Sequence, residues 1–216
     1  MNAAQLFLSS FAVGLSGAMS PGPLLVVVIA ETVTAGVAAP LLLMAGHAVL
    51  ELVMAGGLLF GLQRLRDQPG FESGLSVAGG LVMILLAADM LRNLGKTDLE
   101  LPAAGSEPRR LAIAAAWRLF GLGIGVSILN PYWTIWWLTI GSGFMANAGV
   151  ATIPKAAAFY TGHVLSDFAW YVLVGVLVVW GRRFLSRRVY RAALGLLAVI
   201  LALFGVAFLW HGTRGL

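Results

Sequence analysis

The chain has 216 residues, of which 60% are hydrophobic and only 11% are charged, and its mean hydropathy is +0.92. Because soluble domains carry about 25% charged residues, this composition excludes an ordinary soluble protein and indicates an integral membrane protein made largely of spans. The net charge of +5 comes from basic residues gathered between apolar segments, which favours a topology signal over nucleic-acid binding. The absence of cysteine excludes disulfides and thiolate metal sites.

Apolar runs long enough to cross a bilayer, about 20 residues each, predict an all-α polytopic membrane protein with six transmembrane helices. The expected spans are Leu6–Ala30, Ala38–Leu62, Leu75–Leu91, Leu111–Ile140, Ile153–Trp180 and Val189–Trp210. The longest polar stretch, residues 92–110, has the composition of a loop. We expect it to be a cytoplasmic linker between two three-helix repeats, residues 1–91 and 111–216.

The basic residues predict how the spans are oriented. If the N-terminus lies outside, the linker and the loop between the last two spans are cytoplasmic. These two regions then hold most of the basic side chains: Arg92, Lys96, Arg109, Arg110, Arg118, Arg182, Arg183, Arg187, Arg188 and Arg191. The outside keeps only Arg64, Arg66, Lys155 and Arg214. The positive-inside rule therefore predicts N-out and C-out in a bacterial-type cytoplasmic membrane, and the late first cation argues against a cleaved signal peptide.

Two spans carry proline at their centre. The first contains Ser20-Pro21-Gly22-Pro23, and the fourth contains Asn130-Pro131. Proline removes a backbone donor and clashes with the preceding turn, so each helix should break there. Ser20 and Asn130 are suitable N-caps for a restarted helix with proline at its first position. Broken helices at membrane depth are typical of transporter binding sites.

The restarted helix ends suit an anionic group, because free N–H groups and the positive end of the helix dipole point outward from them. Trp133 follows the second break and is placed to form a pocket wall. The alternative is a pair of helix kinks whose free backbone groups are hydrogen-bonded by neighbouring helices, with no ligand. On the binding interpretation, the expected substrate-binding residues are Ser20, Pro21, Gly22, Pro23, Asn130, Pro131 and Trp133.

A second motif also occurs in both halves: Gly-His followed by an acid four residues after the histidine. His47 pairs with Glu51, and His163 pairs with Asp167. Residues four apart share a helix face, and both histidines fall near mid-membrane, where an ionised acid costs at least ~2.5 kcal/mol. We expect these four residues to couple protons to transport. The alternative is a structural hydrogen bond that holds the helices together and contributes ~1 kcal/mol.

The two halves show further correspondence. The separation from Glu51 to Gly79 equals that from Asp167 to Gly195. Because each half has an odd number of spans, the halves must be inverted relative to one another, as in many secondary transporters. We therefore expect two inverted three-helix repeats, each with a broken first helix. Glu31, about ten residues past the first break, is expected at the membrane interface as a gate at the cytoplasmic mouth.

The early Ser20-Pro21-Gly22-Pro23 motif, the later Asn130-Pro131 and the six-span layout together resemble the LysE/RhtB family of small amino-acid exporters. The resemblance covers essentially the whole chain. It implies export of amino acids or related small metabolites across a cytoplasmic membrane, driven by an ion or proton gradient. The family motif maps only onto Pro21, Gly22, Pro23, Asn130 and Pro131, so the His–acid pairs are an inference from spacing alone.

The leading hypothesis is thus a proton-coupled exporter that works by alternating access, not an enzyme, and without a cofactor or resident metal. Its partners are an amino-acid substrate, the lipid bilayer and a coupling ion, H⁺ or else Na⁺, and a homo-oligomer is a candidate assembly. The alternative is a divalent-metal exporter in which the two His–acid pairs form an N₂O₂ site. The lack of cysteine and of a His-rich loop speaks against that alternative.

Overall fold

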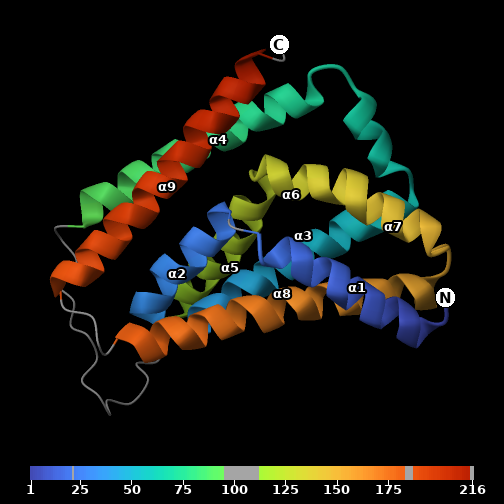
Figure 1. Cartoon of the computed structure of the whole chain (residues 1–216), viewed down its shortest axis with the longest axis horizontal. Helices are drawn as coiled ribbons and strands as arrows, with labels where there is room; N and C mark the ends of the chain where they lie inside the picture. The colour runs from blue at the N-terminus through green and yellow to red at the C-terminus, as the bar shows by residue number, and fades with distance from the viewer. Residues whose placement is uncertain (21, 95–111, 183–186, 215–216) are drawn as a thin grey trace.

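The computed structural model describes residues 1–20, 22–94, 112–182 and 187–214. All regular structure within these ranges is helical (Figure 1). The helices are α1 Ala3–Ala18, α2 Pro23–Ala35, α3 Ala38–Leu59, α4 Phe71–Asn93, α5 Ile113–Ile128, α6 Pro131–Trp136, α7 Ser142–Asn147, α8 Ile153–Arg182 and α9 Arg187–Arg214. A short 3₁₀ helix, Leu62–Asp67, follows α3, and a π-helical turn, Trp137–Gly141, joins α6 to α7.

Four of these helices, α3, α4, α8 and α9, are each long and apolar enough to cross a membrane. The pair α1 and α2 and the pair α5 and α6–α7 each pass the same criterion together, although each pair is bent. The described part of the chain therefore contains four to six candidate spans, and six if each bent pair counts as one. The all-helical membrane architecture is confirmed, whereas the inverted repeat stays a prediction.

The first break separates α1 from α2, whose axes meet at 80°. Gly22 is the N-cap of α2 and Pro23 occupies the first turn. The prediction that Ser20 caps this helix is therefore wrong: the Ser20 hydroxyl donates to the Ser16 carbonyl oxygen at 3.2 Å. The physical reason is that the second proline moves the helix start, because a residue before proline is held in extended geometry. Pro21 lies outside the described residues.

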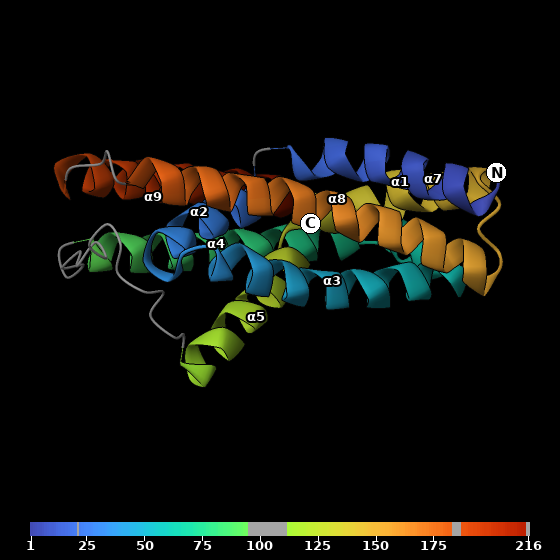
Figure 2. The same cartoon turned by 90° about the horizontal axis from the view of Figure 1, so that it is seen from below.

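The second break was predicted at the correct residue. Asn130 is the N-cap of α6, and its side-chain oxygen accepts from the Tyr132 amide at 3.1 Å. Pro131 occupies the first turn of that helix. The bend between α5 and the α6–α7 segment is 64°, and Figure 2 shows α5 running obliquely to α3 and α8, with its N-terminal end projecting from the other helices.

The helices pack in three main pairs: α4 with α9, α1 with α8 and α3 with α5 (Figure 1). Glycines allow two of these pairs to approach closely. A Cβ atom at Gly46 of α3 would collide with the Phe120 carbonyl oxygen of α5, and one at Gly162 of α8 with the Phe7 carbonyl oxygen of α1. Small residues permit this kind of close helix packing in membranes. The predicted linker lies outside the described residues from position 95 onward, as does part of the loop between α8 and α9.

Candidate transport site

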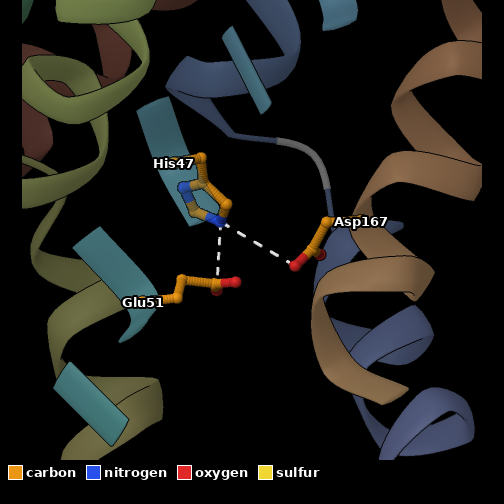
Figure 3. A group of neighbouring side chains, drawn as sticks. All are labelled: His47, Glu51 and Asp167. Atoms are coloured by element: carbon orange, nitrogen blue, oxygen red, sulfur yellow. Dashed lines mark ion pairs between the residues drawn. The ribbon is translucent and has the colours of Figure 1, made fainter. Parts of the chain in front are cut away.

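The two His–acid pairs meet in one buried cluster. His47 and Glu51 lie on one face of α3, and His163 and Asp167 lie on one face of α8. Each of the four residues is at most 5% exposed. His47 Nε2 lies 3.1 Å from Glu51 Oε1 and 3.9 Å from Asp167 Oδ2 (Figure 3). His163 Nε2 lies 3.0 Å from the same Glu51 oxygen and 3.7 Å from the same Asp167 oxygen.

Glu51 is the centre of this cluster. In addition to its contacts with the two imidazoles, its Oε1 accepts hydrogen bonds from the indole N–H of Trp137 at 3.2 Å and from that of Trp133 at 3.4 Å. Hydrogen bonds to an ionised acceptor are stronger than those between neutral groups. Glu51 therefore ties α3 to α8 and to the segment after the second break through a single oxygen.

A serine on a further helix orients one of the histidines. Ser127 of α5 donates its hydroxyl proton to the Gly123 carbonyl oxygen at 2.7 Å. His47 Nδ1 lies 2.6 Å from the same hydroxyl oxygen. Since the hydroxyl has only one proton, His47 Nδ1 carries the hydrogen in this contact. In neutral His47 the lone pair is then on Nε2, which faces the two carboxylates.

Three polar atoms of the cluster have no hydrogen-bond partner within the described structure. They are Glu51 Oε2, Asp167 Oδ2 and His163 Nδ1, and all three are buried. Buried polar atoms without partners cost free energy. Two carboxylates with free oxygens and two imidazoles can take up a proton, an ammonium group or a metal ion. His47, Glu51 and Asp167 in particular offer ligand atoms within 4.8 Å of one another.

Aromatic rings enclose the cluster on the side of the second break. The centroids of the Trp136 and Trp137 rings lie 5.0 and 4.7 Å from that of His163. Phe159 stacks on the same imidazole at 6.2 Å. The π-helical turn begins at Trp137, and such turns are frequent at functional sites.

A single cavity joins the cluster to both helix breaks. It has a volume of about 60 Å³, room for a few water molecules at roughly 10–15 Å³ each. Of the residues predicted from the sequence, it is lined by Ser20, Gly22, Asn130, Trp133, His47, Glu51, His163 and Asp167. Pro23 is buried but does not line it, and neither does Pro131. The roles of all these residues stay predictions.

Several cavity residues were not predicted. Ser127 lies on α5 and Tyr171 on α8, and both line the cavity. Gly14 of α1 does so too, where a Cβ atom would collide with the His163 and Ser166 side chains. Ser127 is a polar residue within an apolar helix, three residues before the Asn130-Pro131 break. This position is the sequence signal that could have identified it as a cavity residue.

Glu31 lies apart from the cavity, in an ion pair with a distant residue. Both of its carboxylate oxygens accept from the Arg118 guanidinium of α5, at 2.9 and 2.5 Å. The Glu31 side chain is 19% exposed and that of Arg118 is 56% exposed. Because α2 continues to Ala35, the helix extends beyond the predicted span end at Ala30.

Comparison with known proteins agrees with this architecture. The family model described as LysE type translocator matches residues 15–212. The chain is 28% identical over 204 residues to the chemotactic transduction protein ChpE of Pseudomonas aeruginosa, covering 91% of this chain and 95% of that protein. No solved structure matches the chain. The family match includes both helix breaks, the buried cluster and five of the six predicted spans in full, so the chain belongs to the LysE type translocator family.

Proposed function

We propose that the protein is a secondary transporter that exports amino acids or related small metabolites across the bacterial cytoplasmic membrane. Membership of a translocator family supports a transport role and a small-molecule substrate. The observation that carries the proposal is that one cavity is bordered by both helix breaks and by a buried cluster of two imidazoles and two carboxylates. A site at discontinuous helices is the arrangement that secondary transporters use for small charged substrates.

The cavity offers complementary partners for the two ends of an amino acid. The substrate carboxylate would bind near the two breaks, beside Gly22 and Asn130. Its ammonium group would face the free oxygens Glu51 Oε2 and Asp167 Oδ2. The neighbouring indole rings add a favourable surface for a cation. The present cavity holds only a few water molecules, so substrate entry requires the helices to move.

Proton exchange at the cluster would couple transport to the membrane gradient. His47 and His163 share one Glu51 oxygen, so adding or removing a proton changes the contact between α3 and α8. Midplane ionisable groups in transporters are commonly proton relays. Substrate and protons would then occupy the cluster alternately, which is the requirement for exchange.

The packing is compatible with two inverted repeats, residues 1–91 and 111–216, that rock against each other. The outer part of the first broken helix, α1, packs on α8 of the second half, and α5 packs on α3 of the first half in the same way. Each contact includes a close approach at a glycine of the Gly-His motif, Gly162 or Gly46. We infer that these paired contacts are the surfaces across which the repeats move.

The ion pair between Glu31 and Arg118 would act as the cytoplasmic gate. With the N-terminus outside, α2 and α5 are the cytoplasmic parts of the two broken spans. The pair joins these two helices, one from each proposed repeat. Opening toward the cytoplasm would separate them, so this pair would break in each transport cycle.

The experiment that tests the cargo is efflux from proteoliposomes loaded with a mixture of amino acids. Efflux is followed with and without an imposed pH gradient, and empty liposomes give the leak. Gradient-dependent loss of one amino-acid class is the expected result. Retention of every amino acid under the gradient, in vesicles whose protein is shown to be folded, would contradict the proposed cargo.

A further inference from the structure

We propose that His47, Glu51, His163 and Asp167 form a binding site for one divalent transition-metal ion, with zinc as the reference ion. The site lies in the cavity that the proposed function assigns to the substrate. The proposal does not depend on an amino-acid cargo, because it concerns binding to the purified protein. It follows from the distances, the orientation of the ring nitrogens and the unpartnered oxygens of the cluster.

The imidazole-to-carboxylate distances are in the range of a tetrahedral site, and His47, Glu51 and Asp167 offer ligand atoms within 4.8 Å of one another. Ligand atoms about 2.1 Å from a tetrahedral zinc ion lie about 3.4 Å from one another. The four imidazole-to-carboxylate distances are 3.0, 3.1, 3.7 and 3.9 Å, on both sides of this value. Both histidines present the same ring atom, Nε2, to the carboxylates. Three ligands are thus already close together, and a movement of the two imidazoles toward each other would complete the four-coordinate site with Nε2 of His163, which lies 3.0 Å from Glu51 Oε1.

The Ser127 contact gives His47 the tautomer that a metal requires. Its Nδ1 donates to Ser127 Oγ, which in turn donates to the Gly123 carbonyl. Metal-binding histidines commonly donate their second ring nitrogen to a neighbour, which fixes the tautomer and the ring orientation. Nε2 of neutral His47 then directs a lone pair at Glu51 Oε1, 3.1 Å away. The lone pair and the carboxylate oxygen repel each other, and a cation bound between them would attract both.

The carboxylates of the cavity also favour a bound cation. Two carboxylates line the cavity, and no Lys or Arg among the described residues lines it. Glu51 Oε2 and Asp167 Oδ2 are buried and lack hydrogen-bond partners in the described structure. Coordination of a divalent ion would satisfy both oxygens and neutralise both charges. The indoles of Trp133 and Trp137 already donate to Glu51, as partners outside the coordination sphere do in metal sites.

The donor set selects a class of ion. Two imidazole nitrogens with two carboxylate oxygens suit zinc, cobalt or nickel. Calcium and magnesium prefer six or more oxygen ligands, which this cavity does not offer. A metal binds the unprotonated ligands and so displaces protons. Metal and protons would therefore replace each other at this site, and a metal would exclude a substrate ammonium group from the same oxygens.

The first experiment measures zinc binding to the full chain purified in detergent, by equilibrium dialysis and elemental analysis. We expect one zinc per chain, with affinity reduced at least tenfold in His47→Ala and in Asp167→Asn. Ser127→Ala should weaken binding by about 10–100-fold, as loss of an outer partner does. His211→Ala is the matched control, because His211 forms an exposed His–acid pair with Glu72 at 3.2 Å and should leave zinc binding unchanged.

A second measurement does not depend on the variants folding. Cobalt added to the wild-type protein should give the intense visible absorption of a four-coordinate ion and should be displaced by zinc. A six-coordinate spectrum, less than one bound zinc per chain, or loss of binding in His211→Ala alone would overturn the proposal. Absent zinc binding with intact amino-acid efflux would contradict this site and leave the proposed function standing. Zinc binding without amino-acid efflux would support this site and contradict the proposed amino-acid cargo.

Discussion

The Glu31–Arg118 pair allows a direct test of the proposed gate. Neutralising either side chain, as Glu31→Gln or Arg118→Gln, removes a bidentate contact between α2 and α5. The Arg118 side chain is 56% exposed, so water screens the attraction, and the pair contributes at most about 1 kcal/mol. If the pair is broken only in the state open to the cytoplasm, either variant should raise the population of that state by up to about fivefold.

The absence of cysteine from the chain makes the assay clean. Leu24 of α2 is 5% exposed and lines the cavity, so a Leu24→Cys variant reports on access to the site. Labelling with a thiol reagent from the cytoplasmic side of inside-out vesicles should be slow in this background. It should become up to about fivefold faster when Glu31 or Arg118 is neutralised.

The control is the exchanged pair, Glu31→Arg with Arg118→Glu, which restores the attraction and should restore slow labelling. Equal labelling rates in the parent and in both single variants would refute the gate. Fast labelling in the exchanged pair, with the protein folded, would show that the attraction between the two charges does not close the cavity. The effect of the single variants would then come from the altered side chains themselves.

Three further predictions concern stability and are measured as thermal unfolding in detergent. Gly46→Ala should destabilise the protein by about 1–3 kcal/mol, because the new methyl group forces α3 away from the Phe120 carbonyl. The control is Gly56→Ala, which has open space around it and should leave stability unchanged. Equal effects of the two substitutions would refute the close contact. Asn130→Ala should cost about 1 kcal/mol through loss of the N-cap, and Asn130→Ser, which keeps a neutral capping oxygen, should retain most of the stability; an unchanged Asn130→Ala protein would show that the cap is dispensable. Trp137→Phe should cost more than about 0.6 kcal/mol, the average for a hydrogen bond in a membrane, because it removes the bond to Glu51 and also leaves a cavity at a fully buried ring; no change would mean that neither effect contributes.

Local chemistry explains which parts of the fold could be predicted. Proline cannot continue a helix from the preceding turn, so both breaks were placed at the correct stretch. Their details depended on neighbouring residues. Asn130 caps α6 as predicted, but the extra proline at Pro23 moved the start of α2 beyond Ser20. Helix existence followed from apolar length, whereas the bend angles did not follow from any local pattern.

The cluster could be predicted only in part. Four-residue spacing placed His47 with Glu51, and His163 with Asp167, on common helix faces. That the two faces meet depends on the packing of α3 against α8, which the spacing does not contain. Ser127 comes from a third helix. Similarly, the partner of Glu31 is 87 residues away in sequence, so the ion pair depends on tertiary structure alone.

The central claim is that the buried cluster drives export through this cavity. The most direct measurement is gradient-driven efflux from proteoliposomes containing Glu51→Gln, Asp167→Asn or the matched control His211→Ala, each shown to be folded. The account predicts that both cluster variants lose gradient-driven efflux, while His211→Ala transports as the unaltered protein does. Full gradient-driven efflux by both cluster variants would contradict it.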